Sequence, residues 1–244
     1  MILSHKVHVL TKKEELDTVR LPGKVVIVLD ILFATSTMVT ALAHGSSEVI
    51  PVNDGDAARA EAQGHAQGSF VMAGELNAIT LEGFAPPTPL ALVEHGVAGR
   101  KLIYSTTNGT VAMRLCADTE EVYCGSLLNG RALVDHLLRN HPDRTVLIVC
   151  AGSANNFNLE DFYGAGYLVD LLAAGLGSGA DLSDAARAAR SLFRHADPFE
   201  SLMDSRVGRM MIARDLVHEV EYAARLSLLD VVARFSGQVL RRVA

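Results

Sequence analysis

Three segments of this sequence place hydroxyl, amide and glycine residues directly after an apolar run and before a helix-like stretch. The segments are 25–43, 101–115 and 145–172. Free backbone N–H groups at the start of a helix bind anions well, because the helix dipole is positive there. The three segments therefore predict a site for a phosphate and a second anionic group, although the same residues also serve as ordinary helix caps. The candidate ligand-binding residues are Thr35, Ser36, Thr37, Thr106, Thr107, Asn108, Gly109, Gly152 and Ser153.

Asp30 and Glu75 are the acidic residues that best suit chemistry beside such a site. Asp30 ends the apolar run VVIVL, where a carboxylate must be paired, hydrogen-bonded or bound to a metal. Glu75 follows the strand-like SFVMAG. Acids beside a phosphate site repel the ligand unless a cation lies between them, and oxygen ligands favour Mg²⁺. We therefore expect a magnesium site, with two alternatives open: Asp30 only caps the following turn, and Glu75 is an ordinary surface residue.

Other reactive side chains give weaker signals. Cys150 ends the run TVLIV and is either a nucleophile or a small buried apolar residue. Cys116, Cys124 and Cys150 form no C-x-x-C pair, which argues against a zinc site and a disulfide framework. The sequence has no Walker motif and no G-x-G-x-x-G motif, so we expect neither ATP hydrolysis nor dinucleotide binding.

The elements that must position these residues follow from the apolar patterning. Continuous apolar runs predict strands that are buried on both faces, and they alternate with segments of helical period such as 130–140. This alternation predicts a layered α/β/α fold with a largely parallel or mixed sheet. In a parallel sheet the three segments would share the carboxyl edge, where α/β sheets bind ligands.

The chain length of 244 residues suits a single compact α/β domain over 1–244. A proline-rich stretch, GFAPPTP at 83–89, predicts a loop, and GLGSGAD at 175–181 predicts a break before a helical tail over 181–244. We expect this tail to pack on the rest of the domain. Its apolar spacing also predicts a homo-oligomer.

Composition narrows the range of partners. The formal net charge of -6 offers no positive excess for nucleic acid or an anionic membrane. No apolar run approaches the roughly 20 residues that cross a bilayer, and the first residues do not resemble an export signal. We expect a cytoplasmic protein that binds a small molecule and neither nucleic acid nor a membrane.

Five segments together are similar to signature segments of the 2-phosphosulfolactate phosphatase family: VVIVLDILFATSTMVTALAHG, AGE at 73–75, STTNGT, CGSLLN and VCAGSANNFNLEDFYGAG. The resemblance covers about 25–172, as a catalytic core. It implies a Mg²⁺-dependent phosphoric monoester hydrolase that converts 2-phospho-3-sulfolactate to sulfolactate and phosphate, a step towards coenzyme M. It also implies an acidic site of Asp30, Glu75 and Asp161, with Asp30 catalytic and all three binding metal. Ser126 and Asn129 join the implied anion-binding lining.

Two departures from the family pattern leave a second hypothesis open. Phe33 stands where the resemblance predicts an arginine, and Ala85–Thr88 replace a segment with an acid, a glycine and an asparagine. An apolar ring cannot replace a bidentate guanidinium. The alternative is a catalytically altered homologue that binds a phosphorylated or sulfonated acid without turning it over. A hydrolase that uses Cys150 is a third hypothesis.

Overall fold

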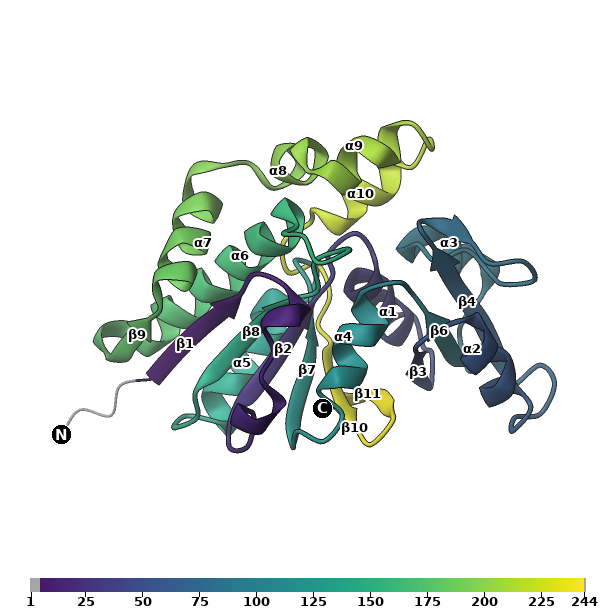
Figure 1. The fold of residues 1–244 in the computed structure, drawn as a ribbon, viewed down its shortest axis with the longest axis horizontal. Coiled ribbons are helices and arrows are strands. Elements are labelled where there is room, and N and C mark those ends of the chain that lie inside the picture. Colours follow the sequence, from purple (N-terminus) through teal and green to yellow (C-terminus); the bar gives the residue numbers. More distant parts are fainter. Residues whose placement is uncertain (1–4, 244) are drawn as a thin grey trace.

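The computed structural model describes residues 5–243 and has the predicted layered α/β architecture with a mixed sheet (Figure 1). The strands in this range are β1 (His5–Leu10), β2 (Val25–Leu29), β3 (Glu48–Val52), β4 (Phe70–Leu76), β5 (Ile79–Thr80), β6 (Lys101–Ser105), β7 (Glu121–Gly125), β8 (Val146–Cys150), β9 (Ala180–Leu182), β10 (Val232–Ser236) and β11 (Val239–Val243). The α-helices are α1 (Ala34–Ala43), α2 (Gly55–Ala62), α3 (Pro89–His95), α4 (Gly109–Leu115), α5 (Gly130–Asn140), α6 (Leu159–Leu176), α7 (Asp184–His195), α8 (Pro198–Asp204), α9 (Arg206–Ile212) and α10 (Val217–Ala223). Short 3₁₀ turns are η1 (Lys13–Glu15), η2 (Thr18–Arg20) and η3 (Gly177–Gly179).

The sheet order is β5-β4-β6-β3-β11-β10-β7-β2-β8-β1-β9. One parallel block contains β4, β6 and β3, and the other contains β7, β2, β8, β1 and β9. Between them lies the antiparallel hairpin β10–β11, drawn in yellow at the centre of Figure 1. The last strands of the chain therefore join the two blocks into one sheet.

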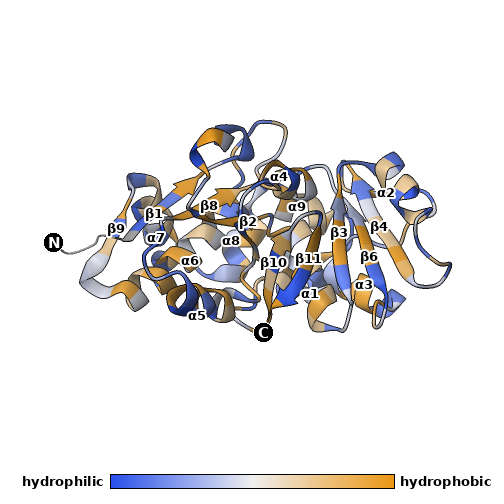
Figure 2. Ribbon diagram, turned by 90° about the horizontal axis from the view of Figure 1, so that it is seen from below, coloured by the Kyte–Doolittle hydropathy of each residue, from blue (hydrophilic) through white to orange (hydrophobic). Residues whose placement is uncertain are grey.

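Strand β2 shows why the apolar runs form strands in the middle of the sheet. Val25, Ile27 and Leu29 pack into the core on one face, and Val26 and Val28 pack into the core on the other. Both faces are covered by helices, so the run is apolar without alternation. In Figure 2 strands such as β1 and β8 are mainly orange, and blue residues lie on the loops, the outer helices and some strand ends.

The chain end differs from the predicted helical tail over 181–244. Helices α7 to α10 do lie in it, but β10 and β11 form a hairpin inside the sheet. The β-branched and aromatic residues Val232, Phe235, Val239 and Val243, with Gly237 at φ 65 in the turn between the strands, favour this hairpin over a helix. The helical spacing that predicts the tail ends near Ala224, before these strands begin.

The sheet also differs from the expectation of one shared carboxyl edge. Three antiparallel pairings, β3–β11, β11–β10 and β10–β7, separate the two parallel blocks. The strands of one block therefore run in the opposite direction to those of the other. The right-handed twist that accumulates across the strands rotates one block relative to the other. The turns after β2 and β6 nevertheless meet, because a Cβ on Gly109 would lie 2.7 Å from Asp30 Oδ2.

Helices α8, α9 and α10 gather over the end of the sheet at which β2 and β8 finish (Figure 1). Helix α10 is anchored by Glu219, a fully buried carboxylate. Its oxygens accept hydrogen bonds from Thr88 Oγ1 at 2.7 Å and from the backbone of Leu90 and Ala91. Glu219 thus caps α3 and holds the proline-rich loop in place. None of the helices in residues 5–243 has the length and hydropathy that crossing a bilayer requires.

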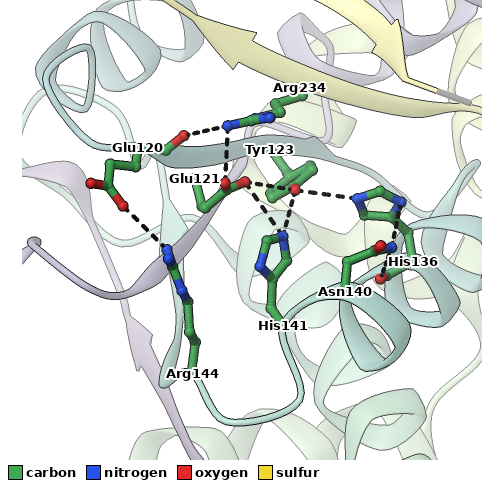
Figure 3. A network of polar contacts seen from close by, with 8 residues as sticks. All are labelled: Glu120, Glu121, Tyr123, His136, Asn140, His141, Arg144 and Arg234. Carbon is green, nitrogen blue, oxygen red and sulfur yellow. Dashed lines mark hydrogen bonds and ion pairs between the residues drawn. The ribbon is translucent and has the colours of Figure 1, made fainter.

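A polar network lies at the opposite end of β7 (Figure 3). The Tyr123 hydroxyl contacts Glu121 Oε2 at 2.8 Å, His141 Nε2 at 2.8 Å and His136 Nε2 at 3.2 Å. Arg234 from β10 donates a hydrogen bond to Glu121 Oε1 at 2.9 Å. The network connects α5 and the β10–β11 hairpin to β7, and the Glu121 carboxylate in it is paired with Arg234.

Candidate active site

A cavity of about 530 Å³ opens where the turns after β2, β6 and β8 meet α9 and the proline-rich loop. Its lining includes six of the residues predicted for the site: Asp30, Glu75, Thr106, Thr107, Asn108 and Ser153. Phe33, Pro86 and Pro87 also line it, so the positions that depart from the family pattern lie at the same cavity.

Asp30 lies at the junction of two strand-to-helix turns. Its side chain packs against Gly109, where any Cβ would come within 2.7 Å of Oδ2 and 2.4 Å of the Ala34 Cβ. Burial raises the pKa of Asp30 to about 7, with further contributions from the negative charges of Glu75 and Glu160. A carboxylate in this setting binds a cation or a proton more readily than a solvated one.

Glu75 is held on the other side of the same cavity by the backbone. Its Oε1 accepts a hydrogen bond from the Thr107 N–H at 2.6 Å, and its Oε2 accepts one from the Ala78 N–H at 2.5 Å. These bonds fix the carboxylate beside the β6–α4 turn. Of the three acidic residues predicted for the site, Asp30 and Glu75 line the cavity.

Lys13 is a cation near the site that sequence reasoning missed. Its Nζ donates to Asn108 Oδ1 at 3.1 Å and to the Ala151 carbonyl at 3.1 Å, and it pairs with Glu14 at 3.2 Å. Because Lys13 occupies the amide oxygen, the Asn108 Nδ2 group is left to donate into the cavity. The Lys13 charge also opposes the rise in the pKa of Asp30.

Asp161 does not reach the cavity. It lies 1% exposed in the first turn of α6, with Oδ1 accepting the Ile31 N–H at 2.9 Å and Oδ2 accepting the Gly152 N–H at 3.1 Å. Burial raises its pKa, and these two hydrogen bonds oppose that rise. Asp161 thus connects the turns after β2 and β8, and its role as a metal ligand stays a prediction. Gly152, predicted to bind the ligand, has a φ of 60 and donates its N–H to Asp161.

The hydroxyls at the start of α1 are also turned away from the cavity. Thr35 and Ser36 donate to backbone carbonyls five positions earlier, and Thr37 donates to the Pro87 carbonyl, each at 2.9 Å. All three residues are fully buried. These hydrogen bonds stabilise the turn and the proline-rich loop, and the anion-binding role of the three hydroxyls stays a prediction.

Ser126 and Asn129 belong to the turn after β7 and lie outside the cavity lining. The Asn129 amide oxygen accepts the Ser126 N–H at 2.9 Å, and its nitrogen donates to the carbonyls of Cys124 and Val231. This side chain bridges β7 to the segment before β10. The hydrogen bonds of these two residues support the fold, and their role in binding an anion stays a prediction.

Arg206, the first residue of α9, lines the cavity and is a second cation that sequence reasoning missed. It lies more than 30 residues beyond the segments with recognisable motifs, and only tertiary packing brings it to Ser153, to which its Nη2 donates a hydrogen bond. Val207, Met210 and Met211 of the same helix add an apolar wall. No local pattern in the sequence distinguishes Arg206 from a surface arginine.

Comparison with known proteins gives a consistent result. Residues 10–238 match the family model described as 2-phosphosulpholactate phosphatase. The chain belongs to this family. A probable 2-phosphosulfolactate phosphatase of Carboxydothermus hydrogenoformans is 36% identical over 93% of this chain and 92% of its own length. One of Symbiobacterium thermophilum is 35% identical over 90% and 95%, respectively.

The fit of the magnesium ion implied by this family can be tested on the carboxylates. In residues 5–243, no group of three or more His, Cys, Asp or Glu side chains converges as a metal cluster, so Asp30, Glu75 and Asp161 do not form one ligand set. Mg²⁺ is commonly held by one or two carboxylates together with water and substrate phosphate. Asp30 and Glu75 fit such a site, because both line one cavity and the Glu75 charge contributes to the raised pKa of Asp30.

Proposed function

We propose that this protein is a phosphatase that hydrolyses a small phosphorylated acid at the Asp30–Glu75 end of the cavity, and that its substrate is 2-phosphosulfolactate. The observation that carries the proposal is the placement of Asp30 against Gly109 beside Glu75, where two strand-to-helix turns meet. Membership of the family and the names of its relatives support this choice of substrate.

Magnesium is the metal that suits this oxygen-rich pair. When bound, Mg²⁺ would offset the phosphate charge and polarise the phosphoryl group. Asp30 and Glu75 would hold it, since both face the cavity and their combined charge calls for a cation. The Asn108 amide nitrogen and the Thr106 and Thr107 turn would position the phosphate oxygens.

In the reaction, the bond between phosphorus and the ester oxygen breaks, and the oxygen of the attacking group bonds to phosphorus. The attacking group is either water, with Asp30 accepting its proton, or the Asp30 carboxylate itself, with the resulting acyl phosphate then hydrolysed. The leaving oxygen takes a proton to become the 2-hydroxyl of the product. The configuration at phosphorus distinguishes the routes, because one direct displacement by water inverts an isotopically chiral phosphoryl group and two successive displacements retain it.

Cys150 is a poor candidate for the attacking group. It is fully buried, lies outside the cavity lining, and burial raises its pKa well above the usual range. A thiol in that state is not ionised at neutral pH. Alkylating reagents should leave phosphate release unchanged while the protein stays folded.

The proposal is tested by measuring phosphate release from 2-phosphosulfolactate and a panel of small phosphomonoesters, with Mg²⁺ and with a chelator. We expect release of phosphate from 2-phosphosulfolactate that requires Mg²⁺ and returns when it is restored. Release that is equal with the chelator would contradict the metal-dependent mechanism. Absence of release from every ester would contradict the assignment as a phosphatase.

A second candidate function is binding without turnover. It is favoured by the Phe33 ring and by Pro86 and Pro87, which give the cavity an apolar wall beside the acidic pair. Calorimetry that detects tight binding of 2-phosphosulfolactate, with no phosphate released over hours at saturating Mg²⁺, would support it. Rapid turnover would exclude it.

The biological setting remains part of the proposal. The reaction would be a step towards coenzyme M, in the cytoplasm, and the protein would act as a homo-oligomer. Sedimentation at micromolar concentration tests the last point, and a monomer would contradict it.

A further inference from the structure

Arg206 is placed for a role that the chemistry at Asp30 does not use. Its guanidinium lines the same cavity as the acidic pair, and its Nη2 donates to the Ser153 hydroxyl. That hydroxyl donates in turn to Asn158 Oδ1 at 2.9 Å. Arg206 is therefore the donor to Ser153, and Ser153 is the donor to Asn158. An arginine carries five N–H donors, and only this bond to Ser153 is found among the described residues.

The neighbours of Arg206 hold it in place. Glu160, in the first turn of α6, is 1% exposed, and its Oε2 has no hydrogen-bond partner in residues 5–243. The positive charge of Arg206 favours the ionised form of Glu160, so the two side chains attract each other. Arg206 is therefore drawn toward Glu160 and Ser153, while its other donors stay available to a ligand.

The cavity lining thus carries two unlike sets of charged groups. Asp30 and Glu75 carry negative charge and suit a phosphate only with a cation between, whereas Arg206 binds an anion directly. Asn158 lines the cavity too, and with its oxygen taken by Ser153 its amide nitrogen adds a donor from a second element. Donors from α9 and from the segment before α6 suit a tetrahedral acidic group, whose three oxygens point in different directions, better than a planar one.

We propose that Arg206 and Asn158, both held by Ser153, bind the acidic group of the substrate that is not hydrolysed, the sulfonate on C3. This inference rests on the proposed function, since it names how that substrate is distinguished from other phosphorylated acids. A guanidinium fork matches two oxygens of a sulfonate. The apolar wall of Val207, Met210 and Met211 limits access of water and strengthens the ionic contact.

The test compares steady-state kinetics on 2-phosphosulfolactate and on 2-phospholactate, which lacks the sulfonate. For Arg206→Ala we expect kcat/KM on the sulfonated substrate to fall about 100-fold, mainly through KM, and kcat/KM on 2-phospholactate to change less than about 3-fold. Arg206→Lys keeps the charge but not the fork and should lie between. Arg209→Ala, on the same helix but outside the cavity lining, is the matched control and should match wild type.

An equal loss on both substrates, or no loss on either, would overturn the inference. Calorimetry with sulfolactate gives a readout that needs no turnover: wild type should bind it, and Arg206→Ala should bind at least about 10-fold more weakly. If wild type releases phosphate from neither substrate, the proposed function fails and calorimetry alone decides the role of Arg206. Equal binding of sulfolactate by wild type and Arg206→Ala would then refute it.

Discussion

The two ends of the β2–β7 pair show what separates a structural carboxylate from a candidate catalytic one. Val25 pairs with Glu121 at one end and Leu29 with Gly125 at the other, so Asp30 lies roughly 16 Å from the Glu121 network. At the far end, Glu121 has an arginine partner and a tyrosine hydroxyl (Figure 3). At the cavity, Asp30 faces other acids, and its pKa rises to about 7.

The difference lies in how each charge is balanced. Glu121 is compensated within the protein, which is what a network that holds elements together requires. Asp30 has no ion-pair partner within 4.0 Å in residues 5–243, and its charge is left for a ligand or a metal to balance. Uncompensated acids in a cavity are typical of functional sites.

Gly109→Ala should have the largest effect among the variants that retain every catalytic side chain. The added Cβ would lie 2.4 Å from the Ala34 Cβ and 2.7 Å from Asp30 Oδ2, so Asp30 must move. We expect phosphate release to fall about 100-fold, because displacement of a catalytic group by about 1 Å has that cost. Gly64→Ala, where the Cβ would meet only the Glu61 carbonyl at 3.4 Å, is the control. Wild-type activity in folded Gly109→Ala would disprove the packing argument.

Asp161→Asn should affect stability. The asparagine side chain has one oxygen, so it can accept a hydrogen bond from only one of the Ile31 and Gly152 N–H groups. Its NH₂ group would then face the other N–H group. We expect the free energy of unfolding to fall by about 2 kcal/mol, measured by denaturant titration. Asp170→Asn, which removes a partly exposed charge that pairs with two arginines of α7, should lose less than about 1 kcal/mol. Equal losses in the two variants would argue against the proposed link between turns.

Tyr123→Phe tests the network at the other end of β7. Removal of the hydroxyl takes away its contacts with Glu121, His136 and His141, and we expect a loss of about 1 kcal/mol. Phosphate release per folded molecule should stay within about 2-fold of wild type, since the cavity is untouched. A large drop in turnover at unchanged stability would show that this end of the strand contributes to function.

The smallest effects concern pH, and the two regions should act in opposite directions. The pKa of Asp30 is about 7 in the folded protein against an ordinary 3.8, so the folded state takes up its proton first as pH falls, and stability rises. Burial lowers the pKa of His136 and His141 below 6.5. There the unfolded state takes up protons first, and stability falls.

Unfolding free energies at pH 8 and pH 5.5 without metal test these signs. Relative to wild type, Asp30→Asn should lose more stability on acidification, because it lacks the gain from Asp30. The double variant His136→Gln/His141→Gln should lose less. The same pH dependence in all three proteins would contradict both assignments.

The sequence predicts the parts of the fold that depend on local patterning. The runs that form β2, β6 and β8 are apolar because both faces are buried, and the α5 segment has helical period. Strand order is a tertiary property, so the hairpin β10–β11 could not be placed in the sheet centre by pattern alone. Its β-branched residues and Gly237 did offer a signal for strands and a turn.

The candidate site shows the same division. The sequence suggests Asp30 and Glu75 because each lies near the end of a strand, and strands of this kind are predicted from local patterning. Thr37 was indistinguishable from an anion ligand, because a hydroxyl at a helix start can turn to a ligand or to a carbonyl, and only packing decides. Lys13 and Arg206 come from segments without motifs and reach the site through tertiary contacts.

The most direct test of the central claim is phosphate release from 2-phosphosulfolactate at saturating Mg²⁺ by wild type, Asp30→Asn and Tyr123→Phe, with circular dichroism to confirm folding. Asparagine keeps the size of Asp30 but removes the charge that would bind metal or attack phosphorus. We predict a loss of about 1,000-fold or more for Asp30→Asn, and turnover close to wild type for Tyr123→Phe. A folded Asp30→Asn that retains turnover within about 10-fold of wild type would show that Asp30 only caps a turn, and would contradict the account.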